Sequence, residues 1–226
     1  MISKELTRHP IQRISKEAIN ELPLARWEGP IRLITTPEEA KQVAAALIDA
    51  GPLGFDTETR PAFHKGQKFP PSLLQLATAD EVLLFQLRST GLPAPLRDIL
   101  STDGIVKAGV AVAFDLQTLQ AIHPFGAAGF VDLAQTAKRR GIGNHGLRGL
   151  AAVVCGIRIS KTARTTNWAN PDLSPQQIQY AATDAWISRE IYLRLKNLPA
   201  RVQSPTDGAP SPANPFTSTS GLPARR

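Results

Sequence analysis

The sequence has one cysteine, Cys155, among its 226 residues. A single thiol excludes an intramolecular disulfide and any zinc site built from several cysteines. The chain also lacks the run of roughly 18 apolar residues that a membrane helix needs. Its first residues include no apolar segment of the secretory kind, and Glu5, Glu17 and Glu21 are atypical of an acid-poor transit peptide. These absences favour a soluble, cytoplasmic protein without a membrane partner.

What is present is an ordinary globular composition with an excess of positive charge. Hydrophobic residues make up 42% of the chain and charged residues 20%, and this length suits one α/β domain with a full core. The net charge of +7 and the pI near 9.9 indicate a polyanionic partner such as nucleic acid, because lysine and arginine displace counterions from phosphates. Many basic proteins bind no nucleic acid, so charge alone does not decide the partner.

The chain divides into three parts by composition. Residues 199–226 are rich in proline, serine and threonine and cannot bury enough surface to offset chain entropy, so they are predicted to be a disordered tail. Residues 1–27 are polar and are predicted to form an irregular N-terminal arm with a short helix at 15–22. The ordered domain is therefore expected at residues 28–198.

Within this domain, strand and helix patterns alternate. Short apolar runs predict strands, and helical spacing and caps, such as Thr36 before Pro37 and Ser174 before Pro175, predict helices. Two of the strands are separated only by a short turn and form an antiparallel hairpin. The pattern predicts an α/β fold with a mixed five- to six-stranded sheet flanked by helices. The predicted strands are 31–34, 53–57, 72–78, 82–87, 105–112 and 129–133, and the helices are 36–50, 94–100, 114–119, 147–155 and 174–195.

Acidic residues occur at three places where these elements begin or end. Asp56 and Glu58, in FDTET, stand two apart on a strand and project from one face, although acids at strand ends commonly face water. Asp115 follows an apolar strand segment and opens a helical run, where it would also serve as an N-cap. Tyr180 and Asp184 are four apart on one helix face, a spacing that by itself is more typical of a surface pair.

Taken together, these acids indicate a binuclear cation site. Mg²⁺ and Mn²⁺ prefer oxygen ligands and keep waters for chemistry. Four carboxylates that converge without a cation would repel one another strongly. The pattern therefore predicts two divalent cations, Mg²⁺ or Mn²⁺, as cofactors.

At this point the motifs resemble those of the DEDD exonuclease superfamily, of ribonuclease H-like fold, in the branch with a catalytic tyrosine. The matching segments are FDTET, VAVAFDLQTL and YAATD, and the surrounding text, including GLRGLAAVVCGIRISK and TNWA, is similar to Werner-type and ribonuclease D-like exonuclease domains. The resemblance covers about residues 28–198. No helicase motor or further helical domain follows it in this sequence.

The resemblance implies a 3'-5' exonuclease that hydrolyses the terminal phosphodiester bond of a nucleic acid with a free 3' end and releases 5'-mononucleotides. It implies that Asp56 bridges the two cations, that Glu58 and Asp184 complete one site, and that Asp115 acts on the other. Tyr180 is expected to orient the attacking water. DNA is slightly favoured over RNA as substrate. The alternative is a non-catalytic nucleic-acid-binding or scaffold protein of the same fold.

Further residues are candidates for substrate contacts. In the loop after the first acidic strand, Arg60, Lys65 and Lys68 are placed to hold phosphates. Phe63 and Phe69 either stack on a base or pack the loop against the core. Outside that loop the candidates are Lys161, Arg164 and Trp168, in a linker before the last helix, and His145, which is alternatively a helix cap.

Overall fold

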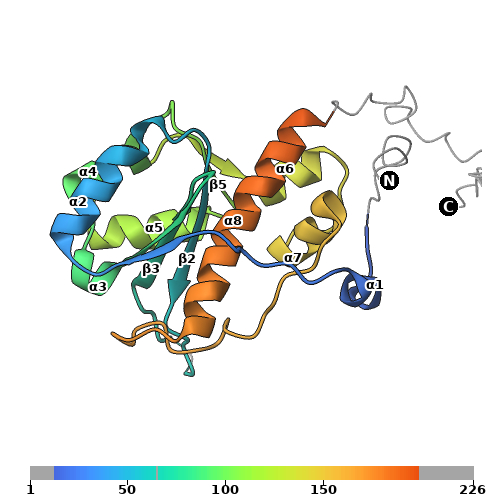
Figure 1. The fold of residues 1–226 in the computed structure, drawn as a ribbon, viewed down its shortest axis with the longest axis horizontal. Coiled ribbons are helices and arrows are strands. Elements are labelled where there is room, and N and C mark those ends of the chain that lie inside the picture. The colour runs from blue at the N-terminus through green and yellow to red at the C-terminus, as the bar shows by residue number, and fades with distance from the viewer. Residues whose placement is uncertain (1–12, 65, 199–226) are drawn as a thin grey trace, which may run out of the picture.

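The positions of the strands follow the apolar runs of the sequence. The structure is a computed structural model that describes residues 13–64 and 66–198, so the predicted tail and residues 1–12 of the predicted arm lie outside the described residues. One sheet has the strand order β1-β4-β3-β2-β5-β6 (Figure 1). Its strands are β1 (Ile31–Ile34), β2 (Leu53–Thr59), β3 (Pro71–Ala77), β4 (Val82–Gln86), β5 (Lys107–Gly109) and β6 (Phe130–Asp132).

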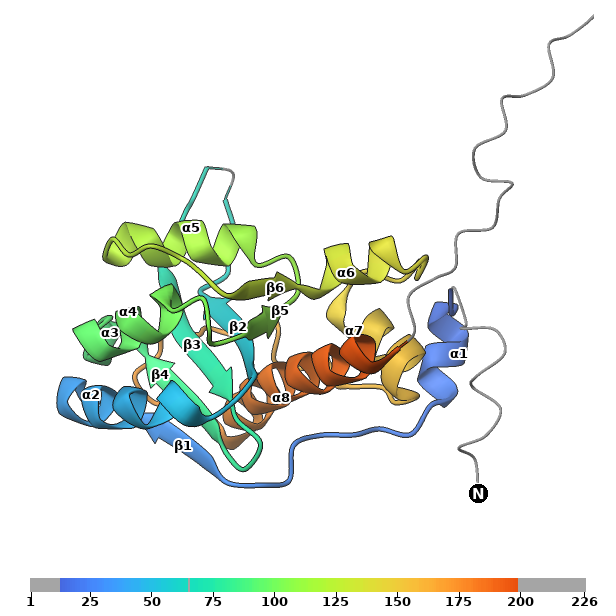
Figure 2. The ribbon, with the colours of Figure 1, turned by 90° about the horizontal axis from the view of Figure 1, so that it is seen from above.

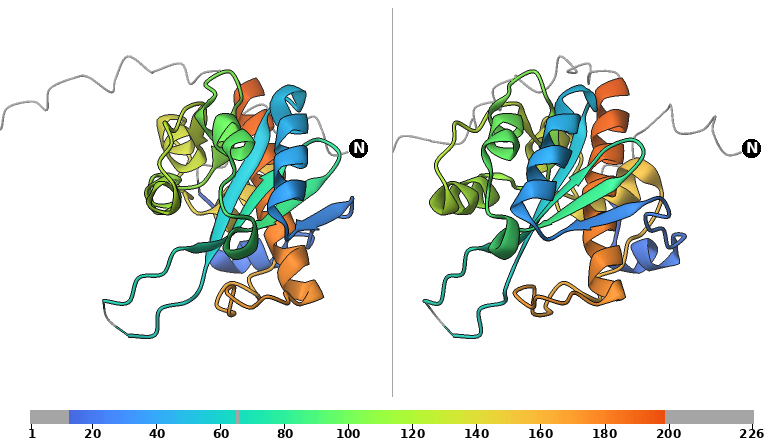
Figure 3. Two further views of the ribbon diagram at one scale, coloured as in Figure 1. Left: turned by 90° about the vertical axis from the view of Figure 1, so that its left-hand side faces the viewer. Right: turned by 60° about the vertical axis from the view of Figure 1, so that its left-hand side comes forward.

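The direction of the strands confirms the predicted mixed sheet with its hairpin. β3 runs antiparallel to both of its neighbours, β2 and β4, whereas the other neighbouring strands are parallel. Because β2 and β5 are parallel, their carboxyl ends meet at the same edge of the sheet. The loop between β2 and β3 extends beyond this edge (Figure 3).

Helices cover both faces of the sheet (Figure 2). On one face, α2, α4 and α5 enclose a core with β2, β3 and β4, while α8 crosses the opposite face and packs on β2, β3 and β4. The helices are α1 (Lys16–Glu21), α2 (Pro37–Ala46), α3 (Leu87–Thr90), α4 (Ala94–Ser101), α5 (Ala113–Ile122), α6 (Leu133–Arg139), α7 (Leu147–Leu150) and α8 (Pro175–Asn197), with a 3₁₀ turn at Leu47–Asp49 and a π turn at Ala151–Cys155. Among the described residues, no helix is both long and apolar enough to cross a membrane.

The predicted helix caps are confirmed. The Thr36 hydroxyl accepts a hydrogen bond from the Glu39 backbone N–H at 3.3 Å, and Pro37 occupies the first turn. Ser174 and Gln177 form a reciprocal capping box at the start of α8. These bonds satisfy backbone donors that have no partner within the helix, and they fix where each helix begins.

The strand predicted at 105–112 is shorter than expected. β5 ends at Gly109, and Ala111 has a left-handed backbone with φ of 57°. The Ala111 backbone N–H donates to Asp132 Oδ1 at 3.3 Å, and Val112 already has helical dihedrals as the N-cap of α5. The apolar run 110–112 is therefore a tight turn that leads directly into α5, because a left-handed residue ends the extended backbone.

The two faces of β2 have different roles. Leu53 and Phe55 are buried in the core beneath α2 and α5, on the face of the strand opposite Asp56 and Glu58. Gly54 faces α8, and a Cβ atom built on it would lie 1.9 Å from the backbone oxygen of Ala185. Because only a hydrogen fits there, Gly54 permits the backbone of α8 to approach the strand.

Substitution of Gly54 by alanine is therefore expected to destabilise the protein by about 1–3 kcal/mol or more, since the added methyl group collides with backbone rather than with a movable side chain. Urea denaturation measures the free energy of unfolding. Gly104→Ala is the matched control, because its Cβ would meet nothing within 4 Å. Equal stability of the two variants would contradict this account of the β2–α8 contact.

Candidate active site

The first two acidic residues lie at the carboxyl end of β2. Asp56 and Glu58 share the face that α8 covers, because they alternate with Phe55 and Thr57 along the strand. The Asp56 carboxylate accepts a hydrogen bond from the Thr57 backbone N–H at 2.9 Å. Both acids are half-buried, so the strand holds two carboxylates at the edge of the hydrophobic interior.

Asp115 reaches the same edge from α5. It lies in the first turn of α5, but Val112 is the N-cap, so Asp115 does not have the capping role that the sequence left open. Its side chain instead accepts a hydrogen bond from the Thr57 hydroxyl at 2.5 Å. This bond connects the start of α5 to β2, and the Asp115 carboxylate lies within electrostatic range of Asp56 and Glu58.

Tyr180 and Asp184 complete the group from α8. Asp184 is 5% exposed, and the Tyr180 hydroxyl interacts with its carboxylate. The ring of Trp168 lies 6.0 Å from that of Tyr180, between centroids. The structure thus brings together all five residues that the motifs singled out, from three separate elements.

Burial and like charge dominate the electrostatics of this group. Burial, followed by the charges of Asp184 and Asp115, raises the pKa of Asp56 well above its ordinary value. Burial and the neighbouring acids likewise raise the pKa of Glu58 to about 9. Burial raises the pKa of Asp184 to about 7, although Tyr180 and the Arg164 guanidinium oppose this shift. Burial also raises the pKa of Asp115.

These carboxylates have the chemistry that a hard divalent cation requires. They offer oxygen ligands whose mutual repulsion a bound cation would relieve. Among the described residues, however, no three His, Cys, Asp or Glu side chains form a preassembled cation site. Binding would therefore involve adjustment of these side chains. The donor set fits Mg²⁺ or Mn²⁺ in type.

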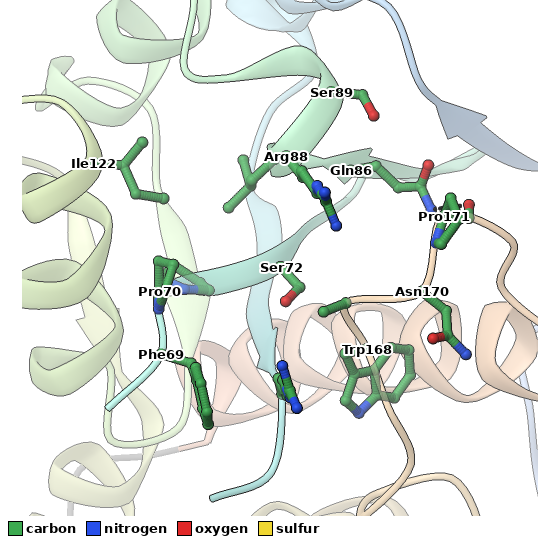
Figure 4. A pocket seen from close by; sticks show the side chains of 14 residues that line it. Phe69, Pro70, Ser72, Gln86, Arg88, Ser89, Ile122, Trp168, Asn170 and Pro171 are labelled. Atoms are coloured by element: carbon green, nitrogen blue, oxygen red, sulfur yellow. Dashed lines mark hydrogen bonds between the residues drawn. The ribbon is translucent and has the colours of Figure 1, made fainter. Parts of the chain in front are cut away.

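Two cavities beside the acids contain several of the predicted substrate residues. Arg60, Lys68 and Phe69 line a groove of about 730 Å³ between the β2–β3 loop and α5. Arg60 and Phe69 also line a neighbouring cavity of about 540 Å³ with Arg88 and Trp168 (Figure 4). The Arg60 guanidinium lies 4.8 Å from the centre of the Phe69 ring, so part of the loop is ordered by a cation–π contact.

The remaining predicted substrate residues occupy different settings. Lys161, Arg164 and His145 line a third cavity, which reaches Tyr180 and Asp184, and His145 Nε2 hydrogen-bonds with the Ile142 carbonyl at 2.9 Å. Phe63 is 78% exposed on the loop, so it does not pack the loop against the core. Trp168 is 2% exposed and belongs to the core beneath α8. Lys65 lies outside the described residues.

Two residues of this site were absent from the sequence predictions. Phe114, directly before Asp115, is 67% exposed and lines the groove beside α5. Gln75 on β3 is paired with Asp56 across the strands, is fully buried, and has no hydrogen-bond partner for either amide atom within the described part of the chain. Its one signal in the sequence is an amide inside the apolar run SLLQLAT.

Comparison with known proteins identifies the family. A 3'-5' exonuclease family matches residues 31–198. The chain belongs to the 3'-5' exonuclease family. This confirms the resemblance to DEDD exonucleases of ribonuclease H-like fold.

Members of this family are similar to the chain in sequence. It is 31% identical over 165 residues to the bifunctional 3'-5' exonuclease/ATP-dependent helicase WRN of Mus musculus, a match that covers 70% of this chain and 12% of that protein. It is 29% identical over 220 residues to a 3'-5' exonuclease of Arabidopsis thaliana, covering 88% of this chain and 74% of the relative. The chain thus spans only a small part of the mouse protein.

Solved structures of exonucleases share the fold. The EXO domain of Nibbler from Aedes aegypti has a TM-score of 0.69 at 22% identity and covers 76% of this chain and 91% of its own. RNase D of Escherichia coli has a TM-score of 0.62 at 21% identity, covering 74% of this chain and 45% of its own. These similarities confirm the α/β architecture of the family.

The raised pKa values predict how stability depends on pH in the absence of metal. The folded pKa values of Asp184 and Glu58 are higher than their unfolded values. At any pH between the two values, the folded state binds more protons than the unfolded chain, so the free energy of unfolding falls as pH rises. We expect the Tm in EDTA to fall from pH 5 to pH 8. Burial lowers the pKa of Lys107 to about 8, so this residue makes stability rise with pH, but only above pH 8.

Asp56→Asn removes one of the like charges and should make this fall smaller. Differential scanning fluorimetry of both proteins across the window measures the effect. A metal-free Tm that rises from pH 5 to pH 8, or an equally steep fall in the variant, would contradict the assignment.

Gln75 predicts a second effect on stability. Gln75→Met removes an amide that has no partner in the part of the chain that the structure describes, and it keeps a similar volume, so the free energy of unfolding should be unchanged or higher by about 1–3 kcal/mol. Gln86→Met is the matched control, because the buried Gln86 amide donates to the Pro171 carbonyl at 2.8 Å and its loss should destabilise the protein. Urea denaturation compares the free energies of unfolding of the two variants. If Gln75→Met loses as much stability as Gln86→Met, the Gln75 amide has a partner in the folded protein.

Proposed function

We propose that the chain hydrolyses the terminal phosphodiester bond at a free 3' end of a nucleic acid and releases 5'-mononucleotides, with DNA favoured over RNA. The observation that carries this proposal is the convergence of Asp56, Glu58, Asp115 and Asp184 on one edge of the sheet beside Tyr180. Membership of the 3'-5' exonuclease family supports the reaction class.

The four acids would hold two divalent cations, Mg²⁺ or Mn²⁺. Bound there, the cations would supply charge neutralisation at the scissile phosphate and a lower pKa for the attacking water. Asp56 interacts electrostatically with both Asp184 and Asp115, so it would serve as a ligand of both ions. Glu58 and Asp184 would complete one ion site, and Asp115 the other.

Tyr180 would position the attacking water rather than remove its proton. Burial and the charges of Asp184 and Glu58 raise the pKa of Tyr180 above its ordinary value, so the hydroxyl stays protonated near neutral pH. A protonated phenol can both donate and accept a hydrogen bond. Asp184, which interacts with that hydroxyl, would fix its orientation toward the water.

The substrate strand would lie in the groove between the β2–β3 loop and α5. The exposed ring of Phe114 offers a surface on which a base can stack, and Lys68 and Arg60 offer cations for phosphates. Arg164 lies close enough to Glu58 and Asp184 to lower the pKa of both, so it would contact a phosphate at the reaction centre. The net charge of +7 would strengthen binding along the strand.

Sequence relatives support DNA as the favoured polymer. The chain is 27% identical over 165 residues to DNA polymerase I of Aquifex aeolicus. RNase D is similar at 21% identity, a level that supports the fold alone.

Matched single-stranded DNA, duplex DNA and RNA, each labelled at the 5' or the 3' end, test the proposed activity. With Mg²⁺ or Mn²⁺, the 5'-labelled DNA should shorten in single-nucleotide steps and the 3'-labelled DNA should lose its label at once as a mononucleotide. EDTA should stop both. Binding without shortening of any substrate with either metal would favour the non-catalytic scaffold, and faster shortening of RNA would reverse the polymer preference.

Two substitutions test the roles of the site residues. Tyr180→Phe should lower kcat by about 100-fold, because the water loses its orienting hydroxyl, while metal affinity stays unchanged. Asp56→Ala should abolish cleavage and weaken metal binding. Tyr192→Phe, on the same helix but in a different core cluster, is the control and should retain wild-type kcat. Wild-type activity of Tyr180→Phe would remove that residue from the mechanism.

A further inference from the structure

The N-terminal arm is attached to the domain next to the candidate active site. Its residues 13–27 precede the family match, which begins at residue 31. The Ile14 backbone N–H donates to Asn144 Oδ1 at 2.8 Å, and Asn144 Nδ2 donates back to the Ile14 carbonyl at 3.1 Å. This pair of hydrogen bonds fixes the chain immediately before α1, which lies beside α7 (Figure 1).

The other end of the arm is fixed as firmly. Arg158 exchanges backbone hydrogen bonds with Pro23 and Ala25, each of 2.9 Å. The Trp27 backbone N–H donates to Thr183 Oγ1 at 3.2 Å, and its carbonyl accepts from Gln179 Nε2 at 2.6 Å. Because Thr183 and Gln179 flank Tyr180 and Asp184 on α8, the arm is bonded to the helix turns that carry those two residues.

Between these anchors, α1 forms one wall of the third cavity, of about 400 Å³. Lys16 and Ile19 line it from α1, and Tyr180 and Asp184 line it from α8. The charged lining residues of the cavity are predominantly cationic: Lys16, Arg148, Lys161 and Arg164, with Asp184 as the acid. The volume lies within the range of roughly 300–1,000 Å³ that small-molecule sites occupy.

Arg148 connects the arm to this cavity. Its Nη2 donates to Asn20 Oδ1 on α1 at 2.6 Å, whereas its buried Nε has no hydrogen-bond partner within the described residues. Because this Nε is shielded from solvent, the guanidinium would meet a ligand through its terminal nitrogens, and a phosphate is an anion that such charged donors bind in charge-assisted hydrogen bonds. Asn20 therefore holds the guanidinium of a residue that lines the cavity together with Asp184.

We propose that the arm completes a phosphate-binding subsite in this cavity, in which Lys16 and the Asn20-held Arg148 bind a phosphate of a nucleotide. The proposal rests on the proposed exonuclease function, since the phosphate belongs either to the bound strand or to the released 5'-mononucleotide. The role of Lys16 is electrostatic attraction, and that of Asn20 is to position Arg148. The arm thereby extends the substrate contacts beyond the family's own domain.

Lys16→Glu tests the subsite in the full-length protein, with Lys41→Glu as control. Lys41→Glu makes the same change of charge at an exposed position of α2, across the sheet from α8. Lys16→Glu should raise KM for single-stranded DNA several-fold at unchanged kcat. The slope of log KM against log salt should become shallower by about 0.7, as for the loss of one phosphate contact on a single strand. Lys41→Glu should match the wild type.

Inhibition by 5'-dAMP separates the two sources of phosphate. A raised inhibition constant in Lys16→Glu assigns the subsite to the released mononucleotide as well, and an unchanged one assigns it to the strand. Asn20→Ala should raise KM in the same direction with the thermal transition retained. If the wild type cleaves DNA but Lys16→Glu and Asn20→Ala keep its KM, salt slope and inhibition constant, the subsite is overturned. If the wild type cleaves nothing, the proposed function fails instead.

Discussion

The close contact between α8 and β2 determines both the core and the site of this protein. Gly54 lets the backbone of α8 approach the strand at Ala185, directly beside Asp184. The same approach brings the Asp184 carboxylate within electrostatic range of Asp56 and Glu58, where its charge raises the pKa of both. Tight packing and charge repulsion are therefore produced by one contact. The apolar clusters on both sides of the sheet stabilise an arrangement that the acids alone would push apart.

This opposition explains why local rules of folding fail mainly near the acids. Gln75, beside Asp56, is a fully buried amide without a partner among residues 13–64 and 66–198, and Ala111 has a left-handed backbone at the turn that leads to Asp115. Each feature costs stability that a purely structural protein would not need to lose. Such violations are expected at functional sites, where geometry for a ligand outweighs local preference. Elsewhere the helix caps and strand alternation agree with the fold.

Features that depend on residues close together in the sequence could be predicted from local patterns, whereas features that depend on residues far apart in the sequence could not. The alternation in β2 and the caps at Thr36 and Ser174 depend on neighbours a few residues away, and these predictions are confirmed. The end of β5 depends on a bond from Ala111 to Asp132, so an apolar run alone could not reveal it. The convergence of the acids was predicted only because several weak patterns were read together. The burial of Trp168 and the exposure of Phe114 reflect tertiary packing that spacing does not encode.

The arm illustrates the same limit and adds a physical complement to the acidic centre. Residues 13–27 show little apolar periodicity, and the contacts that hold them pair polar groups far apart in sequence, such as Ile14 with Asn144. These contacts place Lys16 and Arg148 close to a centre with an excess of carboxylates. A nucleic-acid phosphate approaching the acids without compensation would meet repulsion. Cations at the rim lower that barrier while the acids remain free to hold metal ions, because the arginine and lysine charges are held on separate elements from the carboxylates. The acids lie on β2, α5 and α8, whereas Lys16 lies on the arm and Arg148 on α7, and this division of charge allows one cleft to attract both a metal ion and a phosphate.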